Sequence, residues 1–292
     1  MAEPLQVFLL PDRQRLNGQS PSAACAKWLS RMNQCQGIAG ETAQLQRHFE
    51  CIPSQWAMAA VCRQAEFGDA SESLWLRADP VHLQVEMRGA RIMAWDTLKL
   101  TELESLAIES SLRPIFGDAG YGFERSSDGF FYIKIARGTP LPDFLPAPEA
   151  LGADLFSILP NDKKWTALFN ECQITLHNLP INVERIRKGQ LAINGLWFWG
   201  QGSLPLQLKH PYLKIASYAW DLKALAAFPH ETHTVERKSA LLDCRQIRRW
   251  SEVEAKLSLK ESFHLDFSDG TILSWRPQFK WYFWRNRSIG FS

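Results

Sequence analysis

Residues 192–202 read Ala192-Ile193-Asn194-Gly195-Leu196-Trp197-Phe198-Trp199-Gly200-Gln201-Gly202 and set the frame for the fold. Their apolar part, Ile193–Trp199, predicts a buried β-strand, because a short continuous apolar run is typical of a strand covered on both faces. Gly200, Gln201 and Gly202 follow directly. A glycine at such a position can adopt a positive φ angle and let backbone N–H groups approach an anion. A tight Gly200–Gly202 turn at the end of the strand, beneath packed tryptophans such as Trp199, explains the same residues without a ligand.

Polar side chains gather just before this strand, around Pro180. They are His177, Asn182 and Arg185, followed at the start of the apolar run by Asn194. Arginine offers a planar fork that fits a carboxylate or a phosphate, and histidine can change its charge near neutral pH. Asparagine also caps helices, and histidine stabilises helix C-termini. The pattern therefore predicts either a small-anion site or a set of contacts at helix ends.

A second polar group lies on a predicted extended segment, Trp75–His82. Arg77 and Asp79 are two residues apart, so their side chains share one face of a strand, and His82 follows close by. The three side chains fit a ligand site, and a salt bridge between Arg77 and Asp79 fits them as well.

The composition is that of an ordinary globular protein of 292 residues, with 46% hydrophobic and 22% charged residues. A net charge of +2 gives no basic excess, so we expect no nucleic-acid partner. The sequence has no apolar run of about 18 residues, so we expect no membrane span. Met1–Leu10 lacks the basic start of a signal peptide, and the six cysteines form no zinc or redox motif. We expect a cytoplasmic protein.

Helical and extended patterns alternate along the chain and predict a mixed α/β fold, with helices packed on a central mixed sheet. Asp128-Gly129 and Asp269-Gly270 each lie between alternating apolar residues, which predicts β-hairpins near 122–135 and 263–275. Thr101-Glu102-Leu103-Glu104 is a capping box that starts a helix, and Pro114 is expected to end it. The aromatic residues from Phe279 to Arg285 predict a last strand.

The chain reads as a single unit over residues 1–292. If it has two lobes, 1–137 and 149–292, the boundary is the segment 138–148, which contains four of the 16 prolines.

Signals for catalysis are weak. His230 and His233 are one residue too close for the zinc-protease spacing, and no Gly-x-Ser-x-Gly elbow is present. The segment Trp275–Arg287 is basic and aromatic, which suits either strand pairing with a protein partner or inward packing.

The spacing His177-x-x-Pro180-x-Asn182-x-x-Arg185, followed by Asn194-x-x-Trp197-x-Trp199-Gly200-Gln201-Gly202, resembles the archaeal-type cofactor-independent phosphoglycerate mutases. That resemblance is confined to about 151–205. From about Leu74 to the end, the chain resembles more closely a bacterial, phosphoglycerate-mutase-like group, the RpfE-type regulatory proteins.

The mutase resemblance implies two divalent metals, often manganese, held by Asp and His, together with a Ser or Thr that takes up the phosphoryl group. Two metals suit this chemistry because they clamp the attacking and leaving oxygens. The present sequence departs from the family at these places. Its first strand, Val7–Leu10, leads into Pro11-Asp12-Arg13 without an Asp-Gly-x-x-Asp segment, and Asp-His pairs are absent. We infer a degenerate active site on a mutase-like scaffold, with no catalytic residue and no cofactor.

We therefore expect a non-catalytic regulatory or binding protein whose ligand is a small phosphorylated or carboxylated anion. The candidate ligand-binding residues are Arg77, Asp79, His82, His177, Asn182, Arg185, Asn194, Trp199, Gly200, Gln201 and Gly202. One alternative is a metal-dependent phosphotransfer enzyme, a mutase or phosphatase that uses manganese through rearranged ligands. The other is a protein–protein interaction module that uses the aromatic C-terminal strands.

Overall fold

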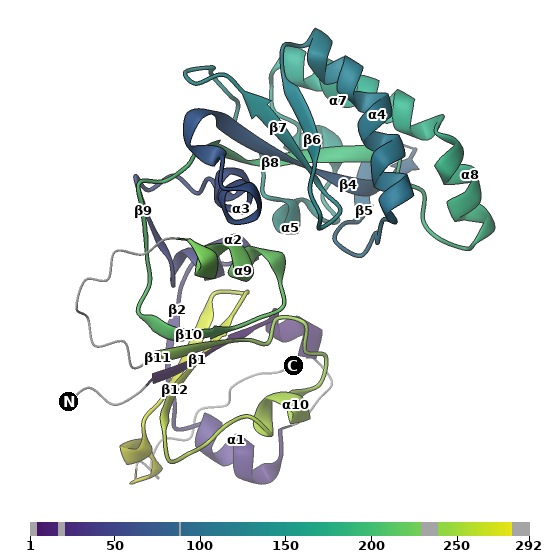
Figure 1. The fold of residues 1–292 in the computed structure, drawn as a ribbon. Helices are drawn as coiled ribbons and strands as arrows, with labels where there is room; N and C mark the ends of the chain where they lie inside the picture. The colour runs from purple at the N-terminus through teal and green to yellow at the C-terminus, as the bar shows by residue number, and fades with distance from the viewer. Residues whose placement is uncertain (1–4, 17–20, 88, 229–238, 282–292) are drawn as a thin grey trace. The chain divides into compact units, whose positions relative to one another are not determined.

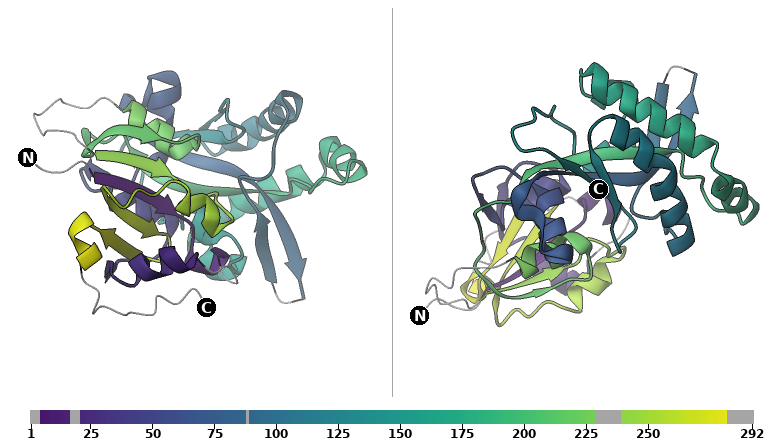
Figure 2. Two further views of the ribbon diagram at one scale, coloured as in Figure 1. Left: turned by 90° about the horizontal axis from the view of Figure 1, so that it is seen from below. Right: turned by 45° about the horizontal axis from the view of Figure 1, so that its top comes forward.

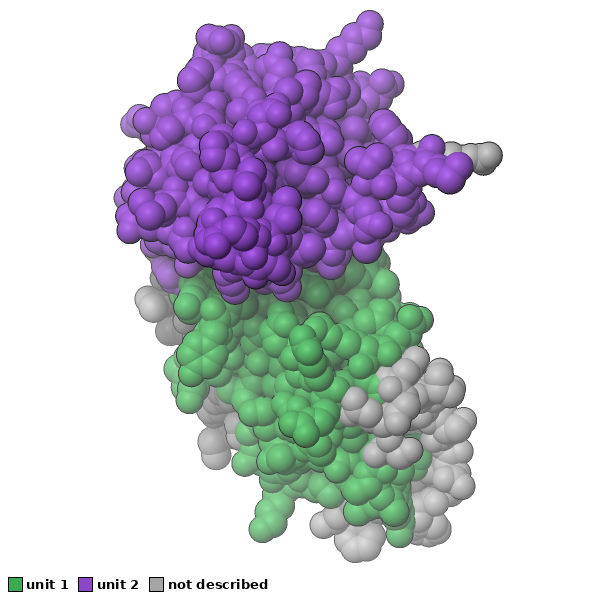
Figure 3. Space-filling model, turned by 90° about the vertical axis from the view of Figure 1, so that its right-hand side faces the viewer, with its two compact units in different colours: residues 1–50, 209–226, 230–292 green, residues 51–208, 227–229 purple. Residues whose placement is uncertain are grey.

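A computed structural model describes residues 5–16, 21–87, 89–228 and 239–281 (Figure 1). The chain divides into two compact units, coloured separately in Figure 3. Unit 1 comprises Met1–Glu50, Lys209–Ala226 and His230–Ser292, and unit 2 comprises Cys51–Leu208 with Ala227–Pro229. The proline-rich segment 138–148 lies inside unit 2. The chain passes between the units near β3 (Glu50–Ile52) and β9 (Gln207–Lys209), which pair with each other.

Unit 1 is built on a six-stranded mixed sheet in the order β10-β11-β1-β12-β13-β2. The first four strands are parallel, and β13 is antiparallel to both β12 and β2. The strands are β1 (Leu5–Leu10), β2 (Asn33–Gln36), β10 (Tyr212–Ala216), β11 (Ser239–Asp243), β12 (Ser262–Phe267) and β13 (Thr271–Trp275). The helices are α1 (Ala23–Leu29), α2 (Glu41–Gln46), α9 (Trp220–Ala227) and α10 (Trp250–Glu254), with short 3-10 helices η1 (Arg13–Leu16) and η3 (Pro277–Trp281).

One face of this sheet carries the apolar core of unit 1. Phe8 of β1 and Phe263 of β12 belong to it, and α1 and α10 supply Leu29 and Trp250. Strand residues alternate between faces, so the residues between the core positions point the other way. The central mixed sheet with packed helices that the sequence predicts is confirmed.

The opposite face holds a polar network around Asp266. Its carboxylate accepts hydrogen bonds from Arg47 at 2.5 and 3.0 Å and lies 2.8 Å from His48 Nε2. Tyr212 lies on the far side of the same imidazole, with its hydroxyl 2.5 Å from His48 Nδ1. Burial alone would raise the pKa of Asp266, but the hydrogen bonds from His48 and Arg47 hold it below its usual range. The network therefore fastens the end of α2 to the sheet.

Unit 2 is organised around the long strand β4, which pairs with β5, β7 and β8. Its strands are β4 (Leu74–Glu86), β5 (Gly89–Ala94), β6 (Gly122–Arg125), β7 (Phe131–Ile135) and β8 (Gly195–Ser203). Its helices are α3 (Met58–Phe67), η2 (Ala70–Glu72), α4 (Glu102–Asp118), α5 (Ala147–Ala150), α6 (Leu155–Ile158), α7 (Lys163–His177) and α8 (Pro180–Arg187). The ends of β4 and β5 project as a hairpin from the rest of unit 2 (Figure 2).

Helices cover both faces of the unit 2 sheet (Figure 1). Phe198 of β8 points to one face, where it meets Phe116 of α4 and Trp165 of α7 with ring centroids 6.1 and 5.6 Å apart. The next residue, Trp199, points to the other face, which α3 covers, because successive side chains of a strand alternate. Residues 195–200 are all buried, as the apolar run predicts.

Both predicted hairpins are confirmed, as the antiparallel pairs β6–β7 and β12–β13. The capping box at Thr101 is present, but the expected end of α4 at Pro114 is wrong, since the helix runs to Asp118. Phe116 in that last turn is fully buried and stacks on Phe123, so packing holds the turn in place. No described helix is both long and apolar enough to cross a membrane.

The expected strand from Phe279 to Arg285 is wrong where it can be compared, because residues 277–281 form η3. The ring of Phe279 packs edge-on against that of Trp275, with centroids 6.2 Å apart. Phe279 is therefore part of the apolar core of unit 1. The remainder of that segment, from residue 282, lies outside the described residues.

Candidate functional site

The Trp-Gly-Gln-Gly motif lies inside strand β8 and is not a turn after it, because β8 extends to Ser203. Trp199 is opposite Arg77 of β4, whereas Gly202 is opposite Trp75. Trp199 and Gly202 are three residues apart in β8, whereas their partners Arg77 and Trp75 are two residues apart in β4. The extra residue in β8 makes the motif a β-bulge. Gly200 has φ +70°, the left-handed value that favours glycine at the first position of such a bulge. The expected Gly200–Gly202 turn is therefore corrected to a bulge.

The two motif glycines also let α3 approach the sheet closely. A Cβ atom on Gly200 would lie 3.2 Å from the backbone nitrogen of Ala59, and one on Gly202 would lie 2.6 Å from Cβ of Ala57. The side chain of Gln201, between them, lies 3.4 Å from the carbonyl oxygen of Pro142. Close packing of helix and strand accounts for both glycines.

Arg77 and Asp79 form a buried, bidentate ion pair on the α3 side of the sheet. Arg77 Nε and Nη2 donate to the two carboxylate oxygens of Asp79 at 2.9 and 2.8 Å, and both residues are 2% exposed. Trp95 Nε1 donates to the same carboxylate at 2.6 Å. The guanidinium lies 3.6 Å from the ring centroid of Phe130 and 4.9 Å from that of Trp199. The charge of Arg77 is thus neutralised inside the unit.

Arg185 is likewise paired within unit 2. Its Nη1 donates to Glu104 Oε1 at 2.9 Å, and its Nε donates to the carbonyl of Leu191 at 2.8 Å. Burial alone would raise the pKa of Glu104, but hydrogen bonds from Thr101 and Arg185 hold that pKa below its ordinary value. Arg185 therefore joins α8 to the start of α4.

The carboxamides of Asn182 and Asn194 hold the backbone where β8 begins. Asn182 Oδ1 accepts from the N–H of Ile193, and its Nδ2 donates to the carbonyl of the same residue, both at 2.8 Å. Asn194 Oδ1 accepts from the N–H of Leu83 at 2.7 Å, and its Nδ2 donates to the Leu83 carbonyl at 2.9 Å. His82 Nδ1 lies 2.8 Å from the carbonyl oxygen of Ala192, which can only accept, so this nitrogen carries the proton.

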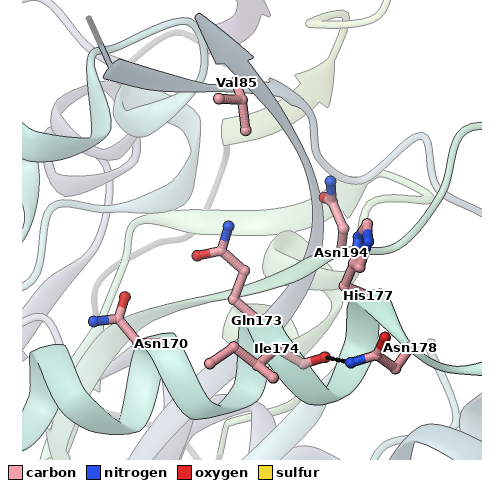
Figure 4. A pocket seen from close by; sticks show the side chains of 7 residues that line it. All are labelled: Val85, Asn170, Gln173, Ile174, His177, Asn178 and Asn194. Atoms are coloured by element: carbon pink, nitrogen blue, oxygen red, sulfur yellow. Dashed lines mark hydrogen bonds between the residues drawn. The ribbon is translucent and has the colours of Figure 1, made fainter.

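A pocket of about 560 Å³ lies between α7 and the end of β4 (Figure 4). Seven residues line it: Val85, Asn170, Gln173, Ile174, His177, Asn178 and Asn194. Two of the predicted site residues, His177 and Asn194, are therefore brought together here, whereas Arg77 and Arg185 are not among the lining residues. Four of the seven side chains are carboxamides, and none is Asp, Glu, Lys or Arg. The pocket can thus hydrogen-bond a ligand without presenting a fixed charge.

Five of the seven lining residues are not among those that the sequence indicates as a site. Asn170, Gln173 or Ile174, and His177 recur at the spacing of one helical face, which is a readable signal. Val85 could not be found in that way, because it comes from a strand 85 residues earlier than Asn170, and only the tertiary fold joins the two.

No family model and no curated protein matches the sequence. The cofactor-independent phosphoglycerate mutase from Thermoplasma acidophilum aligns with 94% of this chain and 90% of its own, at 14% identity and a TM-score of 0.37. The PH0037 protein from Pyrococcus horikoshii aligns with 94% of this chain and 88% of its own, at 10% identity and a TM-score of 0.44.

Among the described residues, no group of three or more His, Cys, Asp or Glu side chains is placed to hold a metal ion. His230 and His233 lie outside the described residues, as does most of the aromatic C-terminal segment.

Proposed function

We propose that this chain is a non-catalytic binding protein and that its ligand occupies the pocket between α7 and β4. The observation that carries the proposal is the chemistry of the pocket lining. Carboxamides and one imidazole surround two apolar side chains, Val85 and Ile174, that are 75% and 65% exposed. Small sites that recognise ligands commonly combine apolar surface with a few placed hydrogen-bonding groups.

The internal pairing of the two arginines supports the same proposal. A ligand that needed Arg77 or Arg185 would have to compete with Asp79 or Glu104 for the guanidinium. The pocket offers instead the donors and acceptors of four carboxamides and of the His177 imidazole. It therefore favours a ligand rich in hydrogen-bonding groups, and a small phosphorylated or carboxylated anion would bind there through His177 and the carboxamides.

Methyl NMR spectroscopy tests this proposal, because Val85 and Ile174 place methyl groups in the pocket. We expect N-acetyl amino acid amides, glycerate or 3-phosphoglycerate to shift these methyl signals in a saturable way. Gln173→Ala should weaken that response, since it removes one of the lining carboxamides. Gln190→Ala, which removes an exposed carboxamide elsewhere on unit 2, should leave it unchanged. Saturable shifts confined to methyl groups outside the pocket would contradict the proposal, as would no response to any of the three probes.

A further inference from the structure

Strand β8 stops before its neighbour β4 does. Gly195, the first residue of β8, is opposite Val81, whereas β4 continues to Glu86 and pairs there only with β5 on its other edge. Among the described residues, no strand therefore pairs with the β8 side of β4 beyond Val81. This open edge faces the pocket, because both Asn194 and Val85 line it.

A carboxamide occupies the first open position on this edge. Asn194 Oδ1 accepts a hydrogen bond from the N–H of Leu83, and Asn194 Nδ2 donates one to the Leu83 carbonyl. The side chain therefore makes the two hydrogen bonds that one residue of a partner strand would make. Asn182 does the same for Ile193 just before β8 begins. Unit 2 thus uses a side-chain amide twice to complete the backbone hydrogen bonds of an extended segment.

Val85 is the next position on the same edge. Backbone groups of a strand alternate between its two edges, so the N–H and C=O of Val85 point the same way as those of Leu83. Glu86 and Gly89 flank the two-residue loop of the β4–β5 hairpin, so their backbone groups face each other, and those of Gln84, two residues earlier, face β5 as well. Val85 lies in register with Ala90, but its N–H and C=O point to the other edge, as those of Leu83 do. Val85 therefore presents a donor and an acceptor to the pocket in the geometry that an added strand requires.

Helix α7 supplies the opposite wall. Gln173 extends from it toward the strand, and Asn170 lies one turn earlier on the same side (Figure 4). Neither carboxamide makes a hydrogen bond to a residue that the structure describes. They are the same chemical group that Asn182 and Asn194 use to hold backbone, so they suit the outer edge of an incoming extended chain.

We propose that the pocket binds an extended polypeptide segment, which adds to the Val85 edge of β4 in line with β8. The proposal rests on the proposed function and names its ligand class. A peptide fits because its backbone repeats the donor–acceptor pair that the Val85 edge and the α7 carboxamides both complement. Its side chains in the pocket would be small or apolar, to pack on Val85 and Ile174, and the lining supplies no Asp, Glu, Lys or Arg to pair with a charged side chain.

Selection from a phage-displayed library of random twelve-residue peptides, followed by fluorescence anisotropy with the selected peptide, tests the proposal. Val85→Pro removes the N–H of the open edge but no bond to β5, because this N–H points away from β5 and proline is tolerated where the N–H of a strand faces solvent. We expect it to weaken peptide binding at least tenfold, and Gln173→Ala to weaken it several-fold. Gln84→Ala, an exposed change whose backbone faces β5, should bind as the unmodified chain does.

A second measurement does not depend on how well the variants fold. Methylation of single backbone nitrogens of the selected peptide should abolish binding at the residue whose N–H pairs with the carbonyl of Val85, because Asn194 already occupies the backbone of Leu83. The inference is overturned if the library yields no pocket-binding peptide, or if Val85→Pro and the methylated peptides bind normally. If small probes still shift the Val85 and Ile174 methyl signals in that case, the proposed function stands and only strand addition fails.

Discussion

Replacing Arg77 with methionine should destabilise unit 2 by about 3–5 kcal/mol, because it leaves the carboxylate of Asp79 buried without its partner. The side chain of Arg77 is 2% exposed and that of Asp79 is 3% exposed, so water cannot compensate. Arg77→Met combined with Asp79→Asn should recover much of the loss. The asparagine removes the unpaired charge and keeps an oxygen for the N–H of Trp95. Urea unfolding of the four proteins in this cycle gives the coupling free energy.

Arg187→Met is a suitable control, because Arg187 pairs with Glu184 on the exposed surface of α8. We expect no measurable change in its unfolding midpoint, since exposed ion pairs contribute little. If Arg77→Met proved as stable as the control, Arg77 would not have the structural role assigned to it. Its guanidinium would then be available to a ligand, as the sequence alone had allowed.

Replacing Gly202 with alanine should also be strongly destabilising, by about 2–4 kcal/mol, from overpacking and backbone strain together. Gly202 has φ +150°, and a Cβ atom would lie 2.6 Å from Cβ of Ala57 and 3.0 Å from Cδ of Gln55. Either α3 or the bulge in β8 must move to admit it. The thermal unfolding midpoint and the near-ultraviolet circular dichroism of the buried tryptophans report this change.

Gly68→Ala separates the two causes. Gly68 has φ +73° at the C-terminus of α3, but a Cβ atom there would meet nothing within 4 Å. It should therefore cost only the strain of the left-handed conformation, about 1–2 kcal/mol. Equal losses in the two variants would show that α3 does not depend on close approach to the Trp-Gly-Gln-Gly motif.

The sequence predicts the local elements of this fold well. Asp-Gly pairs locate both hairpins, and the capping box at Thr101 locates the start of α4. These signals succeed because each depends on neighbouring residues alone. The end of α4 fails for the opposite reason, since the burial of Phe116 against Phe123 overrides the local effect of Pro114.

The candidate site could be predicted only in part. Residue types near Pro180 indicate polar chemistry, but their roles depend on distant partners. Arg185 is paired with Glu104, 81 residues away, and Asn194 with the backbone of Leu83, 111 residues away. The pairing of Arg77 with Asp79 could be predicted, because two residues on one strand face share their surroundings. The bulge could not, because a bulge is defined by the register between two strands.

The most direct test of the central claim, that this chain binds a ligand without catalysis, is a turnover assay with 3-phosphoglycerate and 2-phosphoglycerate in the presence of manganese. Magnesium, zinc and cobalt complete the metal series, and a chelator serves as the control. We expect no interconversion and no phosphate release above the protein-free blank with any metal. Metal-stimulated turnover that the chelator abolishes would contradict it and would restore the phosphotransfer enzyme as the function of this chain.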